Sequence, residues 1–411
     1  MSEGYYFKSE NLTLSNVEGK YYKNGEELKT EDGEGEYTEQ KFDKEIKSAV
    51  SHWVNNRFDN IVCLIGAGAS VVLGNDGIDK QCGQTVQMIS GDVFSSLKSE
   101  RYIFESGECD VFSLKDLVEK SQYTSGSVTD DEVTSDFNLE DFLSDLLAYK
   151  KFVPRDEKVK FENSINAIFQ VIIKATSYNY NIEKFKHGKF LNILSKLTRK
   201  EQKLNIVTTN YDTLIEDSAN KEGFTVLDGF KFAQTPIFDA SMFDWHLIKD
   251  VPNIKTQEVE YMPKVINLLK IHGSLTWERD STEKSILRKS KGNVKNPVMV
   301  FPSSNKYAQS YQEPYFELFA KFQELLKRNN TLLITSGFSF ADNHISRMIL
   351  QAIKSNGSLQ VLATDYNIEP ESPNENWSEL VKMQERDYQI AFLQATMNGK
   401  LTYYLGEDNE Y

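Results

Sequence analysis

Five apolar runs in this chain each end in glycine or small polar residues, and this pattern constrains the fold more than any other feature. The first run, residues 61–65, ends in Gly66-Ala67-Gly68-Ala69-Ser70. The later runs end in Thr209-Asn210-Tyr211-Asp212, His272-Gly273-Ser274, Gly337-Phe338-Ser339-Phe340 and Thr364-Asp365. Short apolar runs bounded by turn residues are typical of buried parallel strands, whose carboxyl ends form one ligand crevice. We therefore expect an α/β fold with a Rossmann-like parallel sheet and one site where the five ends meet.

Composition narrows the classes of function. The 411 residues include 61 acidic and 47 basic side chains, which gives a formal net charge of −14. Nucleic-acid binding needs a concentrated positive face, so we expect no direct nucleic-acid partner. The three cysteines, Cys63, Cys82 and Cys109, form no CxxC pair, which supports neither a disulfide framework nor a zinc site. Without a leader-like N-terminus or an apolar stretch of membrane-spanning length, the sequence predicts a cytoplasmic protein with no membrane partner.

The sequence divides into three parts. Residues 1–45 form a polar N-terminal arm, in which Asn24-Gly25 predicts a β-hairpin, the alternative being a disordered acidic arm. Residues 46–366 contain all five blocks and form the catalytic domain, with a helical insertion or cap over about 95–200. Residues 367–411 form a C-terminal extension. Because an isolated hairpin is marginally stable in water, we expect it to dock on a neighbouring copy, and so we expect a homo-oligomer.

The glycine turn at 66–70 has the form of a phosphate-binding turn. Glycines directly after a buried strand let the backbone approach a pyrophosphate, which would rest on the N-terminus of the next helix. The dehydrogenase fingerprint has a third glycine where this chain has Val71, and no acidic strand end follows about 20 residues later. The turn alone is equally consistent with a plain strand-to-helix corner.

Asn210, Asp212 and His272 are the candidate chemical groups. Taken singly, each is more typical of a structural residue, since Asn and Asp after a strand often cap the next helix. A single histidine after a strand is likewise more often a hydrogen-bonded structural residue than a base. Their placement together, at successive strand ends, favours a reactive site.

In this order the blocks resemble those of the sirtuin superfamily, whose members share a Gly-Ala-Gly-x-Ser turn, an Asn-x-Asp motif and a His-Gly motif. The corresponding positions here are 66–70, 210–212 and 272–273, and 337–339 stands where the family has a Gly-Thr-Ser-like loop. The resemblance covers about residues 55–366.

Three departures from the sirtuin deacylases indicate a different branch. Those enzymes carry two CxxC pairs after the His-Gly motif, but here no cysteine follows Cys109, so we expect no zinc ribbon and no metal site. Their Gly-Ile-Pro-Asp-Phe-Arg segment is replaced by residues 74–79, and their Gln before the Asn is Thr209. With these features the chain resembles the sirtuin-like NAD hydrolases of bacterial anti-phage defence, most closely the subunit that is paired with a HerA-like ATPase.

This resemblance implies that NAD is the substrate. Asn210 would orient a water and the ribose hydroxyls, His272 would be the general base, and Asp212 would orient the ribose or hold its own loop. The resemblance also implies three groups of cofactor-binding residues. The pyrophosphate would lie over Gly66, Ala67, Gly68 and Ser70, with Thr209 beside Asn210. The adenosine would lie near Gly337, Phe338, Ser339 and Asp365.

The implied activity is an NAD glycohydrolase that depletes NAD during abortive infection. A deacylase or an ADP-ribosyltransferase is an alternative, although a deacylase needs a peptide groove that the missing zinc module usually frames. Alternatives of another class are a nuclease subunit and a non-catalytic, NAD-sensing assembly subunit of a HerA-like ATPase complex. A nuclease would need clustered carboxylates to hold a metal, and a scaffold has no need of Asn210 and His272.

Overall fold

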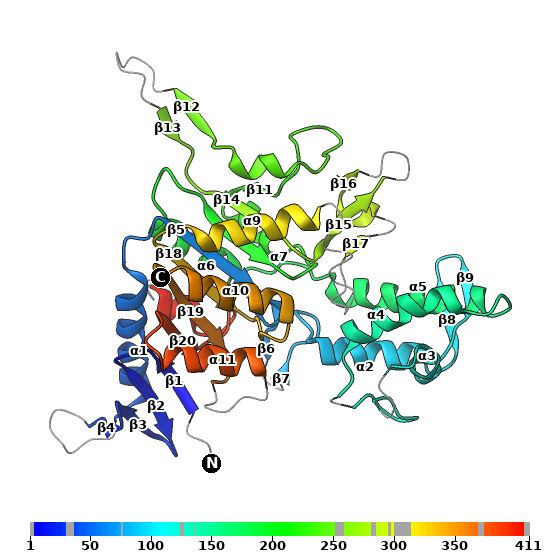
Figure 1. The fold of residues 1–411 in the computed structure, drawn as a ribbon, viewed down its shortest axis with the longest axis horizontal. Helices are drawn as coiled ribbons and strands as arrows, with labels where there is room; N and C mark the ends of the chain where they lie inside the picture. The colour runs from blue at the N-terminus through cyan, green and yellow to red at the C-terminus, as the bar shows by residue number, and fades with distance from the viewer. Residues whose placement is uncertain are drawn as a thin grey trace.

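A computed structural model describes residues 4–29, 37–74, 77–123, 127–134, 136–250, 259–280, 285–294, 297–299, 314–368 and 374–406. Its centre is an 11-stranded sheet in the order β11-β14-β10-β5-β18-β19-β20-β1-β2-β3-β4 (Figure 1). Neighbouring strands from β11 to β20 are parallel. Their bounds are β11 Thr225–Leu227, β14 Val265–Lys270, β10 Leu204–Thr208, β5 Asn60–Ile65, β18 Thr331–Ser336, β19 Leu359–Asp365 and β20 Ile390–Gln394. The predicted α/β class with a parallel sheet is confirmed.

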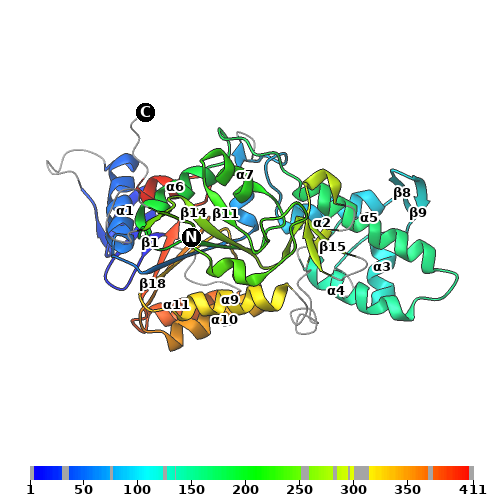
Figure 2. The ribbon, with the colours of Figure 1, turned by 90° about the horizontal axis from the view of Figure 1, so that it is seen from above.

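Helices cover both faces of this sheet (Figure 2). One face is covered by α1 (Glu39–Val54), α6 (His187–Leu197), α7 (Leu214–Lys221) and α12 (Leu401–Leu405), which share one apolar core with the strands. The other face is covered by α9 (Tyr315–Lys327), α10 (Asn343–Ser355) and α11 (Glu375–Gln384), which share a second core. Every residue of β5, β14 and β18 is buried, as expected for strands covered on both sides.

The N-terminal strands extend the same sheet. Strand β1 (Gly4–Lys8) pairs antiparallel with β20, and β2 (Thr13–Val17), β3 (Lys20–Lys23) and β4 (Glu26–Glu27) follow in order. Asn24 and Gly25 have φ values of 52° and 82°, which a type I′ turn requires, so the predicted hairpin is present. It is docked on this chain's own sheet, and it therefore gives no argument for a second copy. Most of the acidic segment that favoured a disordered arm, residues 30–36, lies outside the described residues.

The part of the chain that connects β5 to β10 forms a helical lobe, which projects from the sheet (Figure 1). It contains α2 (Val86–Leu97), β8 (Arg101–Phe104), β9 (Gly107–Asp110), α3 (Leu114–Ser121), α4 (Leu139–Tyr149) and α5 (Lys158–Thr176). Its separate core extends from Ile89 to Ala175. The helical insertion was expected over about 95–200, a range that includes α6. Helix α6 is not part of the lobe, because its buried residues Phe190 and Leu194 pack in the core of the sheet.

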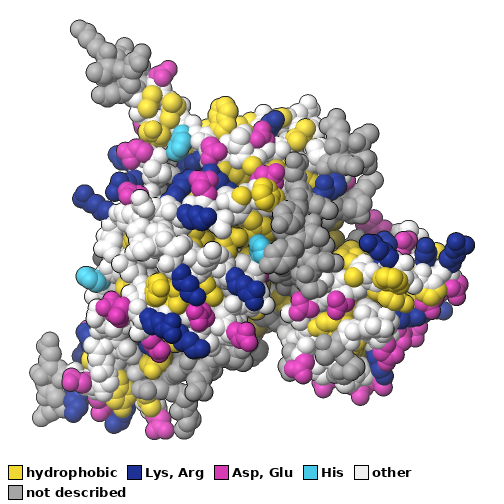
Figure 3. Space-filling model, in the orientation of Figure 1, with side chains coloured by type: hydrophobic (Ala, Val, Ile, Leu, Met, Phe, Trp, Pro, Cys, Tyr) yellow, Lys and Arg dark blue, Asp and Glu magenta, His cyan; other side chains and the backbone are white. Residues whose placement is uncertain are grey.

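Shorter elements complete the chain. After the His-Gly motif, β15 (Gly273–Arg279) forms a small sheet with β16 (Ile286–Arg288) and β17 (Pro297–Met299). The others are β6 (Leu73–Gly74), β7 (Gly77–Ile78), β12 (Ile248–Asp250), β13 (Val259–Tyr261) and the 3-10 helices η1 (Ala67–Ser70), η2 (Lys150–Phe152), η3 (Ala240–Asp244) and η4 (Lys291–Asn293). Among the described helices, none combines the length and apolar character needed to cross a bilayer. Acidic and basic side chains are interspersed over the face shown in Figure 3.

Candidate functional site

The strand ends that were predicted to converge lie in one row across the sheet. The strand register pairs Lys270 with Thr208, Thr208 with Ile65, Ile65 with Ser336, and Ser336 with Thr364. Each block of the sequence analysis begins within two residues of this row. Neighbouring strands lie about 4.8 Å apart, so the row spans roughly 19 Å from β14 to β19.

The turns after β5 and β18 pack directly against each other. The amides of Gly66 and Gly68 donate hydrogen bonds to the carbonyl oxygens of Ser336 and Gly337, both at 3.0 Å. A Cβ on Gly66 would lie 2.5 Å from the Gly337 oxygen. Gly337 has φ +64°, and a Cβ there would lie 2.0 Å from the Ala69 nitrogen. These glycines are therefore required for backbone contact between the two turns, whatever ligand they also approach.

The glycine turn leads into a 3-10 helix, not into the α-helix that was expected to carry a pyrophosphate. The 3-10 helix η1 has four residues and is followed by extended backbone at Val71, and α2 begins only at Val86. The amides of Gly66, Gly68 and Ala69 all bond within the protein. The turn therefore offers close backbone approach but fewer free N–H groups than the N-terminus of an α-helix.

Asn398 from the C-terminal extension holds η1 in place. Its Nδ2 donates to the carbonyl oxygens of Ala69 and Val71, both at 2.9 Å. Its Oδ1 accepts a hydrogen bond at 3.1 Å from the amide of Lys186, directly before α6. One side chain thus joins the C-terminal extension, the glycine turn and the return from the helical lobe.

Asn210 lies against the glycine turn, on the neighbouring strand end. Its Nδ2 donates to the Gly66 carbonyl oxygen at 3.0 Å and to the Ser70 Oγ at 3.1 Å. Its backbone amide donates to the Thr208 Oγ1 at 3.0 Å. Because both Nδ2 protons are used within the protein, the Oδ1 oxygen is the group of this half-buried side chain that can accept a hydrogen bond from a ligand.

Asp212 is buried behind Asn210, and its carboxylate holds the loop. Oδ2 accepts from the Ser70 hydroxyl at 2.8 Å, and Oδ1 accepts from the Leu214 amide at 3.0 Å. The sequence left two roles open for Asp212, and these contacts favour the loop-holding role over direct contact with a ribose.

A buried lysine supports the same loop, and two further titratable groups lie near it. Lys270, at the end of β14, donates to the Asp212 carbonyl oxygen and, at 3.0 Å, to the Glu216 Oε1. Burial raises the pKa of Glu216, and the neighbouring Lys270 opposes that rise. His187, at the start of α6, is fully buried, and this burial lowers its pKa to about 4 although the charge of Asp212 acts in the opposite direction.

His272 is paired with Asp342, a residue to which the sequence analysis gave no role. The imidazole Nε2 lies 3.3 Å from the Asp342 Oδ2, and the two side chains are 6% and 9% exposed. Asp342 ends the segment 337–342, and in the sequence an Asp at this position indicates only a common helix cap. Lys270 and Asn398 were missed for a related reason, because their contacts are made with residues far away in the sequence.

The remaining predicted residues are distributed along the row. The Thr209 amide donates to the Ile65 carbonyl oxygen at 3.1 Å. Phe338 is 5% exposed and packs in the core beside Phe340, so its ring faces away from a ligand. Ser339 is exposed. Asp365 stands at the far end of the row, where burial raises the pKa of its carboxyl group.

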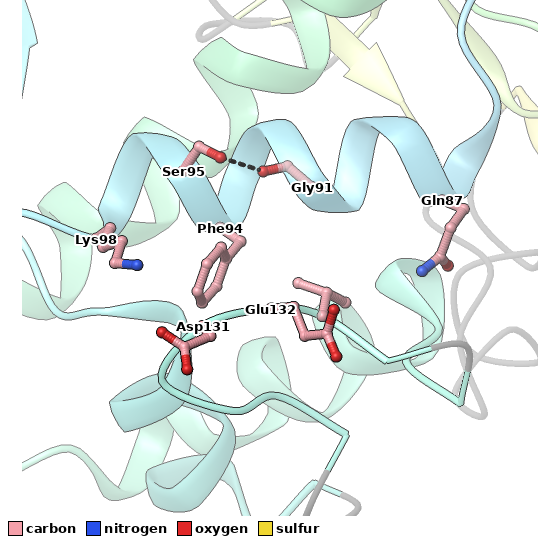
Figure 4. A pocket seen from close by; sticks show the side chains of 8 residues that line it. Gln87, Gly91, Phe94, Ser95, Lys98, Asp131 and Glu132 are labelled. Atoms are coloured by element: carbon pink, nitrogen blue, oxygen red, sulfur yellow. Dashed lines mark hydrogen bonds between the residues drawn. The ribbon is translucent and has the colours of Figure 1, made fainter.

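A separate groove of about 400 Å³ lies in the helical lobe (Figure 4). It runs between α2 and the loop of residues 131–133, and its lining includes Phe94, Lys98, Asp131 and Glu132. None of these residues belongs to the strand-end row. Within the described residues, no group of three or more His, Cys, Asp or Glu side chains could hold a metal ion.

Comparisons with known proteins give one family match. No curated protein matches the sequence. A solved chain from work on the structural basis for the mechanism and regulation of Sir2 enzymes shares 10% identity with a TM-score of 0.35, covering 84% of this chain and 98% of that one. Residues 204–393 match the family model of the SIR2-like domain, a range that includes Asn210, Asp212, His272 and Asp342. This family match, on a parallel sheet of the kind described above, supports a sirtuin-like protein.

Proposed function

We propose that this protein is an NAD glycohydrolase, which cleaves NAD to nicotinamide and ADP-ribose. The observation that carries the proposal is the placement of Asn210 and His272 at adjacent strand ends beside the 66–70 turn. The SIR2-like match over 204–393 supports an NAD-utilising enzyme. The roughly 19 Å row is long enough to take an extended dinucleotide, with its adenosine toward Asp365 and its nicotinamide ribose toward His272.

Cleavage of the N-glycosidic bond passes through an oxocarbenium-like state, so the site has to orient the ribose and deliver a water to the carbon that becomes positive. The fixed Oδ1 of Asn210 accepts a hydrogen bond from that water or from a ribose hydroxyl. His272 takes the proton as general base. Asp212 is a positioning residue, because its two oxygens hold Ser70 and the loop backbone. Nicotinamide leaves as a neutral ring, which lessens the need for a general acid.

The test is nicotinamide release from NAD by the purified protein, with His272→Ala and Asn210→Ala beside it. His52→Ala is the matched control, since His52 is an exposed histidine on α1, away from the strand ends. We expect both site variants to lose at least about 100-fold in kcat and the control to match wild type. Undiminished nicotinamide release by His272→Ala would contradict the proposal. So would a wild-type protein that binds NAD but releases no nicotinamide, whether it is assayed alone or with a HerA-like ATPase.

The biological role that we propose rests on the resemblance. In this role the protein depletes NAD in a bacterial anti-phage system of the abortive-infection type, as a homo-oligomer that pairs with a HerA-like ATPase. An NAD hydrolase left unrestrained would harm its own host, so we expect its activity to be gated by assembly. Separate elution of the protein and a HerA-like ATPase at physiological salt would contradict the pairing.

A further inference from the structure

We infer that Asp342 is a positioning residue for His272, which it holds through Nε2 so that Nδ1 is the atom that accepts a proton. The inference deepens the proposed function and depends on it for the identity of the substrate. It concerns a carboxylate contributed by the loop between β18 and α10.

Two elements hold the pair rigidly. His272 lies two residues beyond the fully buried strand β14, and Asp342 is the N-cap residue of α10. The Oδ1 of Asp342 accepts hydrogen bonds from the amides of His344 at 2.9 Å and Ile345 at 3.2 Å. The helix therefore fixes the carboxylate, and its Oδ2 lies within ion-pair distance of the imidazole, 3.3 Å from Nε2, without the alignment of a hydrogen bond.

The helix end also favours the charge that the pairing needs. The N-terminus of an α-helix carries a partial positive charge, which stabilises a negative side chain at the cap. The 13-residue helix α10 supplies this field at Asp342. The low exposure of both side chains keeps water from weakening the interaction between the carboxylate and the imidazole ring.

The pairing assigns a role to each ring nitrogen. A carboxylate is an acceptor only, so the neutral ring places its single proton on Nε2 and leaves the Nδ1 lone pair unprotonated. Among the described residues, the imidazole of His272 makes its polar contact with Asp342 through Nε2, which leaves Nδ1 for a ligand. In the reaction, a water oxygen forms a bond to the ribose carbon and a water proton moves to Nδ1. The bond from that carbon to the ring nitrogen of nicotinamide breaks, and its electron pair leaves with nicotinamide.

The test is Asp342→Asn, which separates the charge from the helix cap. Asn caps a helix as well as Asp does, so the bonds from His344 and Ile345 survive. Its amide N–H then faces Nε2, which forces the ring proton onto Nδ1 and removes the base. We expect kcat to fall by about 10²- to 10⁴-fold, as for a wrong histidine tautomer elsewhere, with KM changed only a few-fold. The melting temperature should fall by no more than a few degrees, because the neutral cap loses its interaction with the helix dipole.

Asp239→Asn is the matched control. Asp239 caps the 3-10 helix η3 by accepting from the Ser241 amide at 3.0 Å, and its ion pair is with Lys231, not with a histidine. We expect this variant to keep wild-type kcat. If Asp342→Asn also keeps wild-type kcat while wild type hydrolyses NAD, the inference is wrong.

A second readout does not depend on turnover. The chain has five histidines, so ¹⁵N-histidine spectra at alkaline pH can be assigned by the signal that His272→Gln removes. We expect Nε2 of His272 to be protonated in wild type and Nδ1 to be protonated in Asp342→Asn. A wild-type proton on Nδ1 would overturn the inference. The expected spectra together with no NAD hydrolysis would contradict only the proposed function.

Discussion

The amide of Gly68 donates a hydrogen bond to the carbonyl oxygen of Gly337 at 3.0 Å, and this contact joins the turns of two neighbouring strands. We expect Gly337→Ala to break it. A Cβ at this position would meet the Ala69 nitrogen at 2.0 Å, on a backbone with φ +64° that L-residues rarely adopt. The expected loss is at least about 2 kcal/mol in the free energy of unfolding, measured by urea denaturation, with weaker NAD binding.

Gly357→Ala is the control for that experiment. A Cβ on Gly357 would meet no atom within 4 Å, and its φ lies outside the left-handed region. We expect its free energy of unfolding to stay within about 1 kcal/mol of wild type. Equal losses for Gly337→Ala and Gly357→Ala would remove the argument for close packing of the turns.

Ser70 links Asn210 and Asp212, so we expect Ser70→Ala to impair the orientation of Asn210. The hydroxyl accepts from the Asn210 Nδ2 and donates to the Asp212 Oδ2. Its removal leaves a buried carboxylate oxygen with one bond fewer, which costs about 1–3 kcal/mol. A double-mutant cycle with Asn210→Ala in kcat/KM should give a coupling energy of about 0.5–3 kcal/mol.

Ser90→Ala serves as the comparison for Ser70→Ala. Ser90 is also buried, but within the described part of the chain its hydroxyl bonds only to the Val86 carbonyl oxygen of its own helix. We expect this variant to keep wild-type kcat. Strictly additive effects of Ser70→Ala and Asn210→Ala would mean that Ser70 does not orient the amide.

Asn398→Asp should weaken NAD binding although Asn398 lies outside the strand-end row. The substitution removes both N–H donors to the Ala69 and Val71 oxygens and places a carboxylate against two carbonyl groups. We expect KM for NAD to rise about 10-fold or more and the protein to lose about 2 kcal/mol of stability. Asn16→Asp is the matched variant, since the Oδ1 of Asn16 accepts from the Gly19 amide and Asp keeps that acceptor. An unchanged KM in Asn398→Asp would show that η1 keeps its shape without this clamp.

His187 predicts a specific loss of stability in acid. Burial lowers its pKa from 6.5 to about 4, so between these values the unfolded chain binds a proton that the folded protein does not. The free energy of unfolding should therefore fall by about 3 kcal/mol as the pH drops from 6.5 to 4, and it should not depend on this group above pH 6.5. Denaturation at several pH values would show a shallower fall in His187→Gln and an unchanged one in His52→Gln. The same slope in all three proteins would exclude His187 as the cause.

The row of strand ends could be predicted from the sequence for a physical reason. Strands covered on both faces are continuous apolar runs, so the first glycine or polar residue marks where each strand leaves the core. The order of the strands could not be predicted in this way. The pairing of Phe7 with Leu393, which adds the N-terminal strands to the sheet, depends on tertiary packing that no local pattern encodes.

The site itself could be predicted only in part. Asn210 and His272 carry recognisable motifs, but Asp342 and Asn398 each look locally like a common feature, a helix cap and a loop amide. Their contacts with His272 and with Ala69 exist only after α10 and the C-terminal extension have packed. No α-helix follows Ser70, although one was expected. Residues 66–71 instead contact the Gly337 turn and Asn398.

The position of β5 in the middle of the sheet has a consequence for synthesis. This strand leaves the ribosome early, but one of its two neighbours, β18, and the Asn398 clamp are translated only after most of the described chain. Parallel strands that are distant in the sequence pair slowly. Until they pair, an apolar strand that is buried in the folded protein is open to aggregation. A nascent chain therefore has no complete glycine turn until residue 398 has emerged, so a product truncated before that residue would lack the turn that the proposed site needs.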